Sequence, residues 1–224
     1  KNFPLLKVIP GIEISADERD GEVHILGYFI DYTHPELLTT LKTMRDSREG
    51  RAEGMVAKLA TLGLPVEWKR VQEIAGDGSI GRPHIAQALL EKGYISTIKE
   101  AFDKYIAWGG PAYVEREKII PADAVGLILR AGGLPVLAHP SFIKDPEGLI
   151  ARLKKSGLVG MEAYYKAYTT EEIKRLLRLA DKYGLIATGG SDYHGLDDNA
   201  ETMMGGTDVP MAAAEKLMAL AGKC

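Results

Sequence analysis

Residues 122–139 read ADAVGLILRAGGLPVLAH, and this stretch decides the fold class. The first part has apolar residues at helical spacing, and Gly132-Gly133 is a typical helix end. The run from Leu134 to Ala138 is short, apolar and typical of a buried strand. A helix that ends at glycines and is followed directly by a buried strand is the repeating unit of α/β proteins.

The same order recurs twice further along the chain. A helix predicted at 146–155 is followed by a strand at 158–164. A helix capped by Thr170 is followed by a strand at 185–188. Repeated alternation of this kind is typical of a parallel sheet or an α/β barrel, so we predict an α/β fold.

The first 120 residues have a different organisation. Two strands are predicted at 7–14 and 22–30, with a turn that ends in Asp20-Gly21. Residues 36–119 contain helical patterns without a buried strand between them, and the stretch from Pro35 to Leu62 is predicted to form one long helix or two shorter ones. We therefore predict an α/β domain formed by residues 1–35 and 120–224, interrupted by a helical insertion domain at 36–119.

Composition restricts the class of protein. The 224 residues include 46% hydrophobic and 26% charged residues, which is typical of a packed globular chain. A formal net charge of −3 excludes a global basic surface for nucleic acid or anionic lipid. The single cysteine, Cys224, cannot form an internal disulfide, and we found neither a signal peptide nor an apolar run of roughly 18 residues. We expect a cytoplasmic protein with no membrane contact and no obligate protein partner.

Five acidic and histidine side chains are candidate metal ligands. Glu13 is predicted to close the first strand, His139 follows the strand at 134–138, and Asp192 and His194 follow the strand at 185–188. The carboxyl ends of parallel strands meet at one face, so these residues can converge. His24 lies near the start of its strand and can join them only if that strand runs opposite to its neighbours. Each residue alone is also compatible with ordinary strand polarity, and the ordered set carries the prediction.

The sequence resembles the polymerase-and-histidinol-phosphatase (PHP) family of metal-dependent phosphoesterases. The resemblance covers nearly the whole chain and is greatest to the branch of nucleoside 3′,5′-bisphosphate phosphatases and 5′-to-3′ oligoribonucleotide exonucleases. It depends on five segments in a fixed order: Pro10-Gly11-Ile12-Glu13-Ile14-Ser15, Val23-His24-Ile25-Leu26-Gly27-Tyr28, Gly81-Arg82-Pro83-His84, Leu137-Ala138-His139-Pro140 and Gly190-Ser191-Asp192-Tyr193-His194.

The resemblance implies a distorted TIM-like (β/α)7 barrel with up to three divalent metal ions in the full-length protein. Mn²⁺ is expected, and Fe²⁺ or Zn²⁺ would also suit oxygen and nitrogen ligands. Glu13 would bridge two metals, and His24 and His139 would complete one metal site. Asp192 and His194 would complete the other two sites. With Glu13, these last two residues are the implied catalytic residues.

One departure from the family is large. The family begins with a His-x-His segment and a following Asp, and then an Asp-His segment, and neither segment is present here. The chain begins with Lys1, and we expect the full protein to contain further residues upstream. The site formed by Glu13, His24 and His139 would then be the one whose protein ligands are all present in this sequence.

A second group of residues suggests an anion site. Gly81-Arg82-Pro83-His84 lies at the start of a predicted helix, where backbone N–H groups favour negative charge. We expect Arg82 and His84 to hold a second phosphate of the substrate, with Arg116 as a further candidate. Glu162 and Tyr164, two apart near the end of a strand, are candidate supports for the metal ligands or ordinary strand residues.

Three functions remain open from the sequence. The preferred one is hydrolysis of phosphate esters of nucleotides or short RNA 5′ ends by metal-activated water. The second is a phosphatase for a small metabolite of the histidinol phosphate type. The third is a metal-stabilised binding module without turnover, which the absence of the upstream motifs would favour if it held for the whole gene product.

Overall fold

The chain folds into two compact units. The computed structural model describes residues 6–18, 21–76, 78–115, 119–193 and 204–222. Residues 1–37 and 118–224 form one unit, which we call the sheet unit, and residues 38–117 form the other, which we call the helical unit. The assignment of these units as a metal-binding domain and its insertion, with boundaries at 35/36 and 119/120, stays a prediction.

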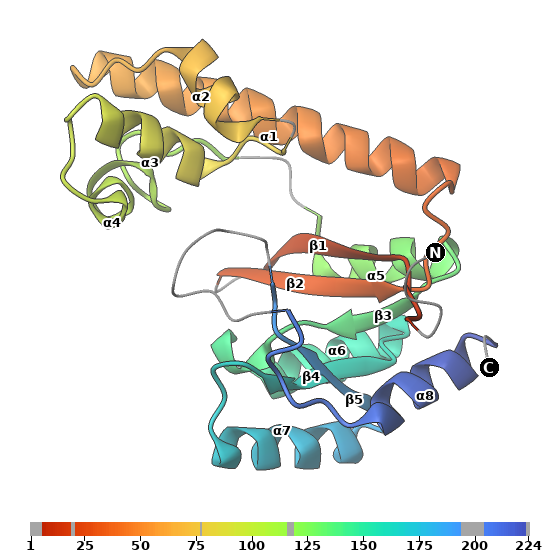
Figure 1. The fold of residues 1–224 in the computed structure, drawn as a ribbon. Helices are drawn as coiled ribbons and strands as arrows, with labels where there is room; N and C mark the ends of the chain where they lie inside the picture. Colours follow the sequence, from red (N-terminus) through yellow and green to blue (C-terminus); the bar gives the residue numbers. More distant parts are fainter. Residues whose placement is uncertain (1–5, 19–20, 77, 116–118, 194–203, 223–224) are drawn as a thin grey trace. The chain divides into compact units, whose positions relative to one another are not determined.

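A single sheet of five strands organises the sheet unit (Figure 1). The spatial order follows the sequence order, with β1 and β2 antiparallel, β2 and β3 antiparallel, and β3, β4 and β5 parallel to one another. The mixed α/β class is therefore confirmed. The strands are β1 (Gly11–Glu18), β2 (Gly21–Tyr28), β3 (Leu134–Leu137), β4 (Gly160–Tyr165) and β5 (Ile186–Gly190).

The structure does not show the TIM-like barrel that the family resemblance implies. In the described part of the chain, β1 has a single neighbour, β2, and β5 has a single neighbour, β4, so the sheet is open at both edges. A barrel requires its first and last strands to pair. The described residues contain no such pair.

Four α-helices accompany the sheet in the described residues. Of these, α5 contacts β1, β2 and β3, α7 contacts β4 and β5, and α8 contacts β5 (Figure 1). We made no prediction for α8. A short 3₁₀ turn, Pro140–Phe142, follows β3. The helices are α5 (Pro121–Arg130), α6 (Pro146–Ser156), α7 (Thr170–Lys182) and α8 (Met211–Leu220).

The start of α7 differs by one residue from the prediction. The cap is Thr169, whose hydroxyl oxygen accepts a hydrogen bond from Glu172 N–H at 3.2 Å, whereas Thr170 is the first helical residue. In return, the Glu172 carboxylate accepts from Thr169 N–H at 2.8 Å. A capping box requires an acidic or amide side chain three residues after the cap, and only Thr169 satisfies that spacing.

The first two strands alternate between two faces. Ile14 and Val23 are buried, and the position where Gly27 would carry a Cβ lies 3.0 Å from Ile128 of α5, so this face packs on the helix. Residues of the other parity, including His24, point to the opposite face. The prediction that the His24 strand runs opposite to its neighbours is confirmed.

The predicted end of the first strand was wrong. β1 continues to Glu18, which pairs with Gly21, and Glu13 is therefore the third residue of the strand rather than the last. The alternation of polar and apolar residues continues through Ala16, which is fully buried, and this pattern extends the hairpin beyond Ser15.

Gly189 allows β4 and β5 to approach each other closely. A Cβ at this position would lie 2.1 Å from the carbonyl oxygen of Tyr164, a backbone atom that cannot move away cheaply. Gly189 and Gly190 both lie within β5.

We expect Gly189→Ala to lower the free energy of unfolding by about 1–3 kcal/mol, because the added methyl group overpacks the contact between the strands. Gly50→Ala is the matched control: it lies within a helix, and its Cβ would meet nothing within 4 Å. It should raise stability by up to about 1 kcal/mol. Urea denaturation followed by circular dichroism measures both changes. Equal midpoints for wild type and Gly189→Ala would contradict the clash.

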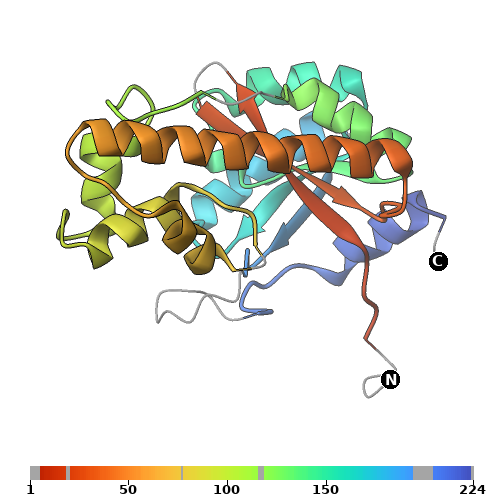
Figure 2. The ribbon, with the colours of Figure 1, turned by 90° about the horizontal axis from the view of Figure 1, so that it is seen from above.

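The helical unit has its own hydrophobic core, which includes Met55, Leu59, Val71, Ile85 and Leu89. Figure 2 shows α1 as one continuous helix, in agreement with the first of the two alternatives for this stretch. The described part of this unit contains no strand. Its helices in the described residues are α1 (Pro35–Thr61), α2 (Trp68–Ala75), α3 (Arg82–Glu91), α4 (Ile98–Ala101) and a π-helical turn (Phe102–Ile106). Residues 35–37 of α1 belong to the sheet unit.

Among the helices in the described residues, none is both long enough and apolar enough to cross a bilayer.

Candidate metal centre

Three side chains from three strand segments converge on one point. The Glu13 Oε1 atom lies 2.6 Å from His24 Nδ1 and 3.7 Å from His139 Nε2, and the two ring nitrogens lie 3.1 Å apart. The imidazole rings are nearly perpendicular, at 81°. Glu13 comes from β1 and His24 from β2, whereas His139 follows β3 by two residues. The antiparallel direction of β2 is what brings His24 to this edge of the sheet.

The geometry of this group fits a divalent cation. Nitrogen or oxygen ligands at about 2.0–2.1 Å from a tetrahedral ion lie about 3.3 Å from one another. The three observed separations, 2.6, 3.1 and 3.7 Å, lie on both sides of that value. Within the described residues, Glu13, His24 and His139 are the one group of three or more such side chains that could hold a metal ion. One carboxylate and two imidazoles suit Mn²⁺, Fe²⁺ or Zn²⁺.

Protons hold the same group together when no cation is bound. The neighbouring imidazoles of His139 and His24 hold the pKa of the Glu13 carboxyl well below its usual range. The hydrogen bonds to Glu13 and Glu22 raise the pKa of His24 to about 9. An imidazole must lose its proton before it can bind a metal through that nitrogen. A cation at this point would therefore replace a proton that His24 shares with Glu13.

Glu22 orients the ring of His24. The two residues are separated by one position on β2, so their side chains share a face. His24 Nε2 lies 3.2 Å from Glu22 Oε1, while Nδ1 faces Glu13 and His139. A carboxylate that accepts from the far nitrogen fixes the orientation of a ligand histidine. We did not predict this role for Glu22, although the i, i+2 spacing was readable in the sequence.

His139 has an unusual backbone, and Glu162 supports it. The φ angle of His139 is 27° and its ψ angle is 58°, in the left-handed region. This conformation costs a non-glycine residue on the order of 1–3 kcal/mol. The His139 N–H donates to Glu162 Oε2 at 2.8 Å. Glu162 is only 6% exposed, and burial raises its pKa to about 7. The hydrogen bond favours the strained conformation that points His139 toward Glu13.

Glu162 and Tyr164, the two candidate supports, lie on either side of an irregularity in β4. The register between β4 and β5 shifts between these two residues, so Glu162 is opposite Thr188 and Tyr164 is opposite Gly189. This irregularity gives the next residue, Tyr165, the supporting position instead. The Tyr165 hydroxyl donates to Asp192 Oδ2 at 2.9 Å. The sequence contains no readable signal for the shift, because it results from how the two strands pair.

The remaining predicted ligands are only partly described. Asp192 follows β5 and has a φ of 51°, so it also adopts the left-handed region that is rare for non-glycine residues. Asp192 contacts Tyr165, whose ring centroid lies 5.9 Å from that of His139, but it is not one of the three converging ligands. His194 and Arg116 lie outside the described residues.

Arg82 and His84 lie at the first turn of α3 in the helical unit. His84 Nδ1 accepts a hydrogen bond from Gly81 N–H at 3.0 Å, so this side chain caps the helix. Partial burial lowers the pKa of His84, which favours the neutral ring. Since Nδ1 accepts, the proton of that ring is on Nε2. The Arg82 guanidinium lies over the ring of Phe102 at 5.6 Å.

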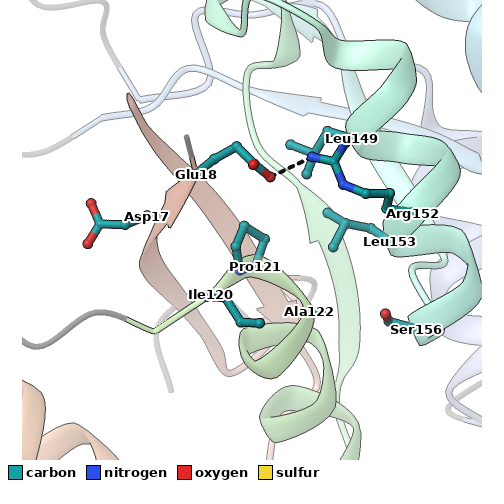
Figure 3. Close-up of a pocket in the computed structure, with 9 residues that line it drawn as sticks. All are labelled: Asp17, Glu18, Ile120, Pro121, Ala122, Leu149, Arg152, Leu153 and Ser156. Atoms are coloured by element: carbon teal, nitrogen blue, oxygen red, sulfur yellow. Dashed lines mark hydrogen bonds and ion pairs between the residues drawn. The ribbon is translucent and has the colours of Figure 1, made fainter. Parts of the chain in front are cut away.

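A cavity of about 540 Å³ occupies another part of the sheet unit (Figure 3). It is bordered by the end of β1, the start of α5 and one side of α6, and the ion pair between Arg152 and Glu18 crosses it at 2.6 Å. None of Glu13, His24 and His139 lines it. The three candidate metal ligands therefore lie outside this cavity.

Comparison with known proteins identifies the family. A 3′,5′-nucleoside bisphosphate phosphatase from Chromobacterium violaceum is 31% identical over 210 residues, which are 89% of this chain and 72% of the relative. The 5′-3′ exoribonuclease Rnm of Escherichia coli is 33% identical over 193 residues, which are 84% of this chain and 66% of the relative. The chain belongs to the PHP family of metal-dependent phosphoesterases. No family model matches the chain, so its assignment to the family depends on the individual relatives.

Solved structures agree with this assignment. A protein described as a metal-dependent phosphoesterase from Bifidobacterium adolescentis superposes with a TM-score of 0.81 at 26% identity, over 96% of this chain and 77% of that one. An amidohydrolase from Chromobacterium violaceum, with bound sulfate and no metal, has a TM-score of 0.79 at 30% identity, over 94% and 76%. This PHP enzyme is a hydrolase of phosphate esters that depends on divalent metal ions.

Proposed function

We propose that this PHP enzyme hydrolyses nucleoside 3′,5′-bisphosphates or the phosphate esters at the 5′ ends of short RNA. The observation that carries the proposal is the convergence of Glu13, His24 and His139 on one point in a chain whose relatives act on such substrates. A third relative, a phosphoribosyl 1,2-cyclic phosphate 1,2-diphosphodiesterase from Eggerthella lenta, is 31% identical and supports sugar cyclic phosphates as a second candidate class.

The residues have distinct proposed roles. Divalent ions, of which we propose Mn²⁺ and up to three in the full-length protein, would supply water activated for attack and would neutralise charge on the phosphoryl oxygens. Glu13, His24 and His139 would hold one of them. Asp192 and His194 are proposed to complete the other sites and, with Glu13, to form the catalytic set.

Chain residues keep the ligands in place for this chemistry. Glu22 fixes the ring of His24, and Glu162 fixes the backbone of His139. Tyr165 donates to Asp192 Oδ2, which orients this carboxylate. Preorganisation of this kind reduces the reorganisation that is needed when the phosphoryl group develops negative charge.

We propose that Arg82 holds the second, non-reacting phosphate of a bisphosphate substrate, with His84 and Arg116 as further candidates for this role. The position of Arg82 at the start of α3 supports this role, because the N–H groups of a helix N-terminus attract anions. The proposal for His84 is limited to its Nε2 side, since Nδ1 caps the helix.

We expect Arg82→Ala to raise the KM for adenosine 3′,5′-bisphosphate about tenfold or more, because a charge-assisted hydrogen bond contributes about 1.5–3 kcal/mol. The KM for adenosine 5′-monophosphate, which lacks the second phosphate, should change much less. Steady-state kinetics on both substrates measure the difference. Equal KM changes for the two substrates would remove Arg82 from this role.

A substrate panel tests the proposed function. Full-length, Mn²⁺-loaded protein is assayed with adenosine 3′,5′-bisphosphate, a 5′-phosphorylated RNA oligomer, a ribose 1,2-cyclic phosphate and histidinol phosphate. The highest kcat/KM should be for one of the first two. A higher value for histidinol phosphate would favour the metabolite phosphatase, and no turnover of any substrate would favour a binding module. We also propose a cytoplasmic location and no obligate protein partner.

A further inference from the structure

Phe142 is an exposed aromatic residue beside the metal centre. It ends the 3₁₀ turn Pro140–Phe142, which begins directly after His139. Its side chain is 66% exposed, and its ring centroid lies 5.8 Å from that of His139. A single exposed apolar residue is ordinary on a protein surface. Its position next to a candidate metal ligand is what makes its surface available to a substrate held there.

The ring of Phe142 is supported from one side by two tyrosines. Tyr165 contacts it nearly perpendicularly at 5.7 Å, and Tyr168 contacts it at 6.0 Å. Both tyrosines are only 9% exposed. The Tyr168 hydroxyl oxygen accepts from Ser141 N–H at 3.1 Å, which ties this pair to the turn that carries Phe142. The exposed part of Phe142 is therefore held by a rigid aromatic base.

A small cavity adjoins the same ring. It has a volume of about 140 Å³, and its lining includes Phe142, Glu22 and Lys144. Glu22 also contacts His24 Nε2, whereas none of Glu13, His24 and His139 lines the cavity. The combination of one aromatic wall with charged side chains is suited to a planar heterocycle, which has an apolar face and a polar edge.

We propose that Phe142 is the surface on which the nucleobase of the substrate stacks. The inference rests on the proposed function, because it requires a nucleotide whose phosphate is bound at the metal centre. Every base has a π-face, so stacking on an aromatic ring binds nucleotides with little base preference. This subsite separates substrates that carry a base from sugar phosphates that lack one.

The experiment compares two substrates that differ only in the base. The full-length, Mn²⁺-loaded enzyme is assayed with adenosine 3′,5′-bisphosphate and with 1-O-methylribose 3,5-bisphosphate. The ratio of their kcat/KM values reports recognition of the base. Phe142→Ala should lower this ratio on the order of tenfold, chiefly through the KM of the adenosine substrate, because the stacking surface is removed. Phe142→Trp should retain the ratio, and Phe142→Leu, which keeps apolar bulk without a ring, should lose it.

Tyr32→Ala is the matched control. Tyr32 is similarly exposed, at 67%, and follows β2 at the far end of that strand from His24, so the ratio should not change. Thermal unfolding shows whether each variant is folded, and Phe142→Leu serves if Phe142→Ala is not. An unchanged ratio in a folded Phe142→Leu, or a wild type without preference for the base, would overturn the stacking role while the phosphoesterase function stands. A wild type that hydrolyses neither substrate would defeat the bisphosphate part of the proposed function, and the stacking role with it.

Discussion

Glu13→Ala should lower kcat/KM by about 10³-fold and should also lower the amount of bound metal. Metal ions contribute several kcal/mol of stabilisation to the charge that develops in phosphoryl transfer, and each 1.36 kcal/mol is tenfold in rate. Glu13 is the carboxylate that faces both His24 Nδ1 and His139 Nε2, so its removal leaves two imidazoles without the negative charge that draws a cation to them. Steady-state kinetics and metal analysis of the purified full-length protein measure the two effects.

Glu36→Ala provides the control for Glu13→Ala. Glu36 lies in the same unit and forms an exposed ion pair with Arg130 at 2.8 Å, away from the converging ligands. Its removal should leave kcat/KM and metal content as in the wild type, because exposed ion pairs contribute little. A Glu13→Ala enzyme that keeps the metal content and the activity of the wild type would show that the centre lies elsewhere.

Glu162→Leu should weaken metal binding or activity by about 10- to 100-fold, the usual effect of removing a group that orients a metal ligand. Leucine fills the buried space but cannot accept the hydrogen bond from His139 N–H, which then loses its partner in the left-handed conformation. Glu162→Gln retains a carbonyl oxygen and should recover most of the loss. Competition with a chelator gives the metal affinity of each variant.

The comparison of the two Glu162 variants separates hydrogen bonding from charge. Recovery in Glu162→Gln shows that the hydrogen bond to His139 matters, since glutamine has no charge. Equal losses in both variants would instead assign the effect to the carboxylate charge near the cation. Wild-type affinity in both variants would contradict the supporting role of Glu162.

The α/β class and most element positions could be read from local patterns. The predicted helix at 122–131 is α5 at Pro121–Arg130, and the predicted strand at 134–138 is β3 at Leu134–Leu137. Apolar periodicity and glycines at helix ends are properties of a few consecutive residues, so they can be recognised without knowledge of the tertiary structure. The antiparallel direction of the His24 strand was also predictable, because it was the one direction that brought His24 to the other ligands.

The supports of the site could not be predicted in the same way. The hydrogen bond from His139 to Glu162 joins residues that are 23 positions apart, and it depends on the register of β3 against β4. The register shift after Glu162 moved the supporting role from Tyr164 to Tyr165. Such shifts result from the pairing of two strands, and neither strand encodes them alone.

The sequence by itself determined the types of secondary structure, the family and the side chains available for metal binding. These are properties of the residues in their order along the chain. Only the tertiary structure decided that Glu13, His24 and His139 meet within 3.7 Å of one another, that the backbone of His139 is left-handed, and that Phe142 lies exposed beside it. Distances between residues far apart in sequence depend on how the strands pair and pack, which local patterns do not specify.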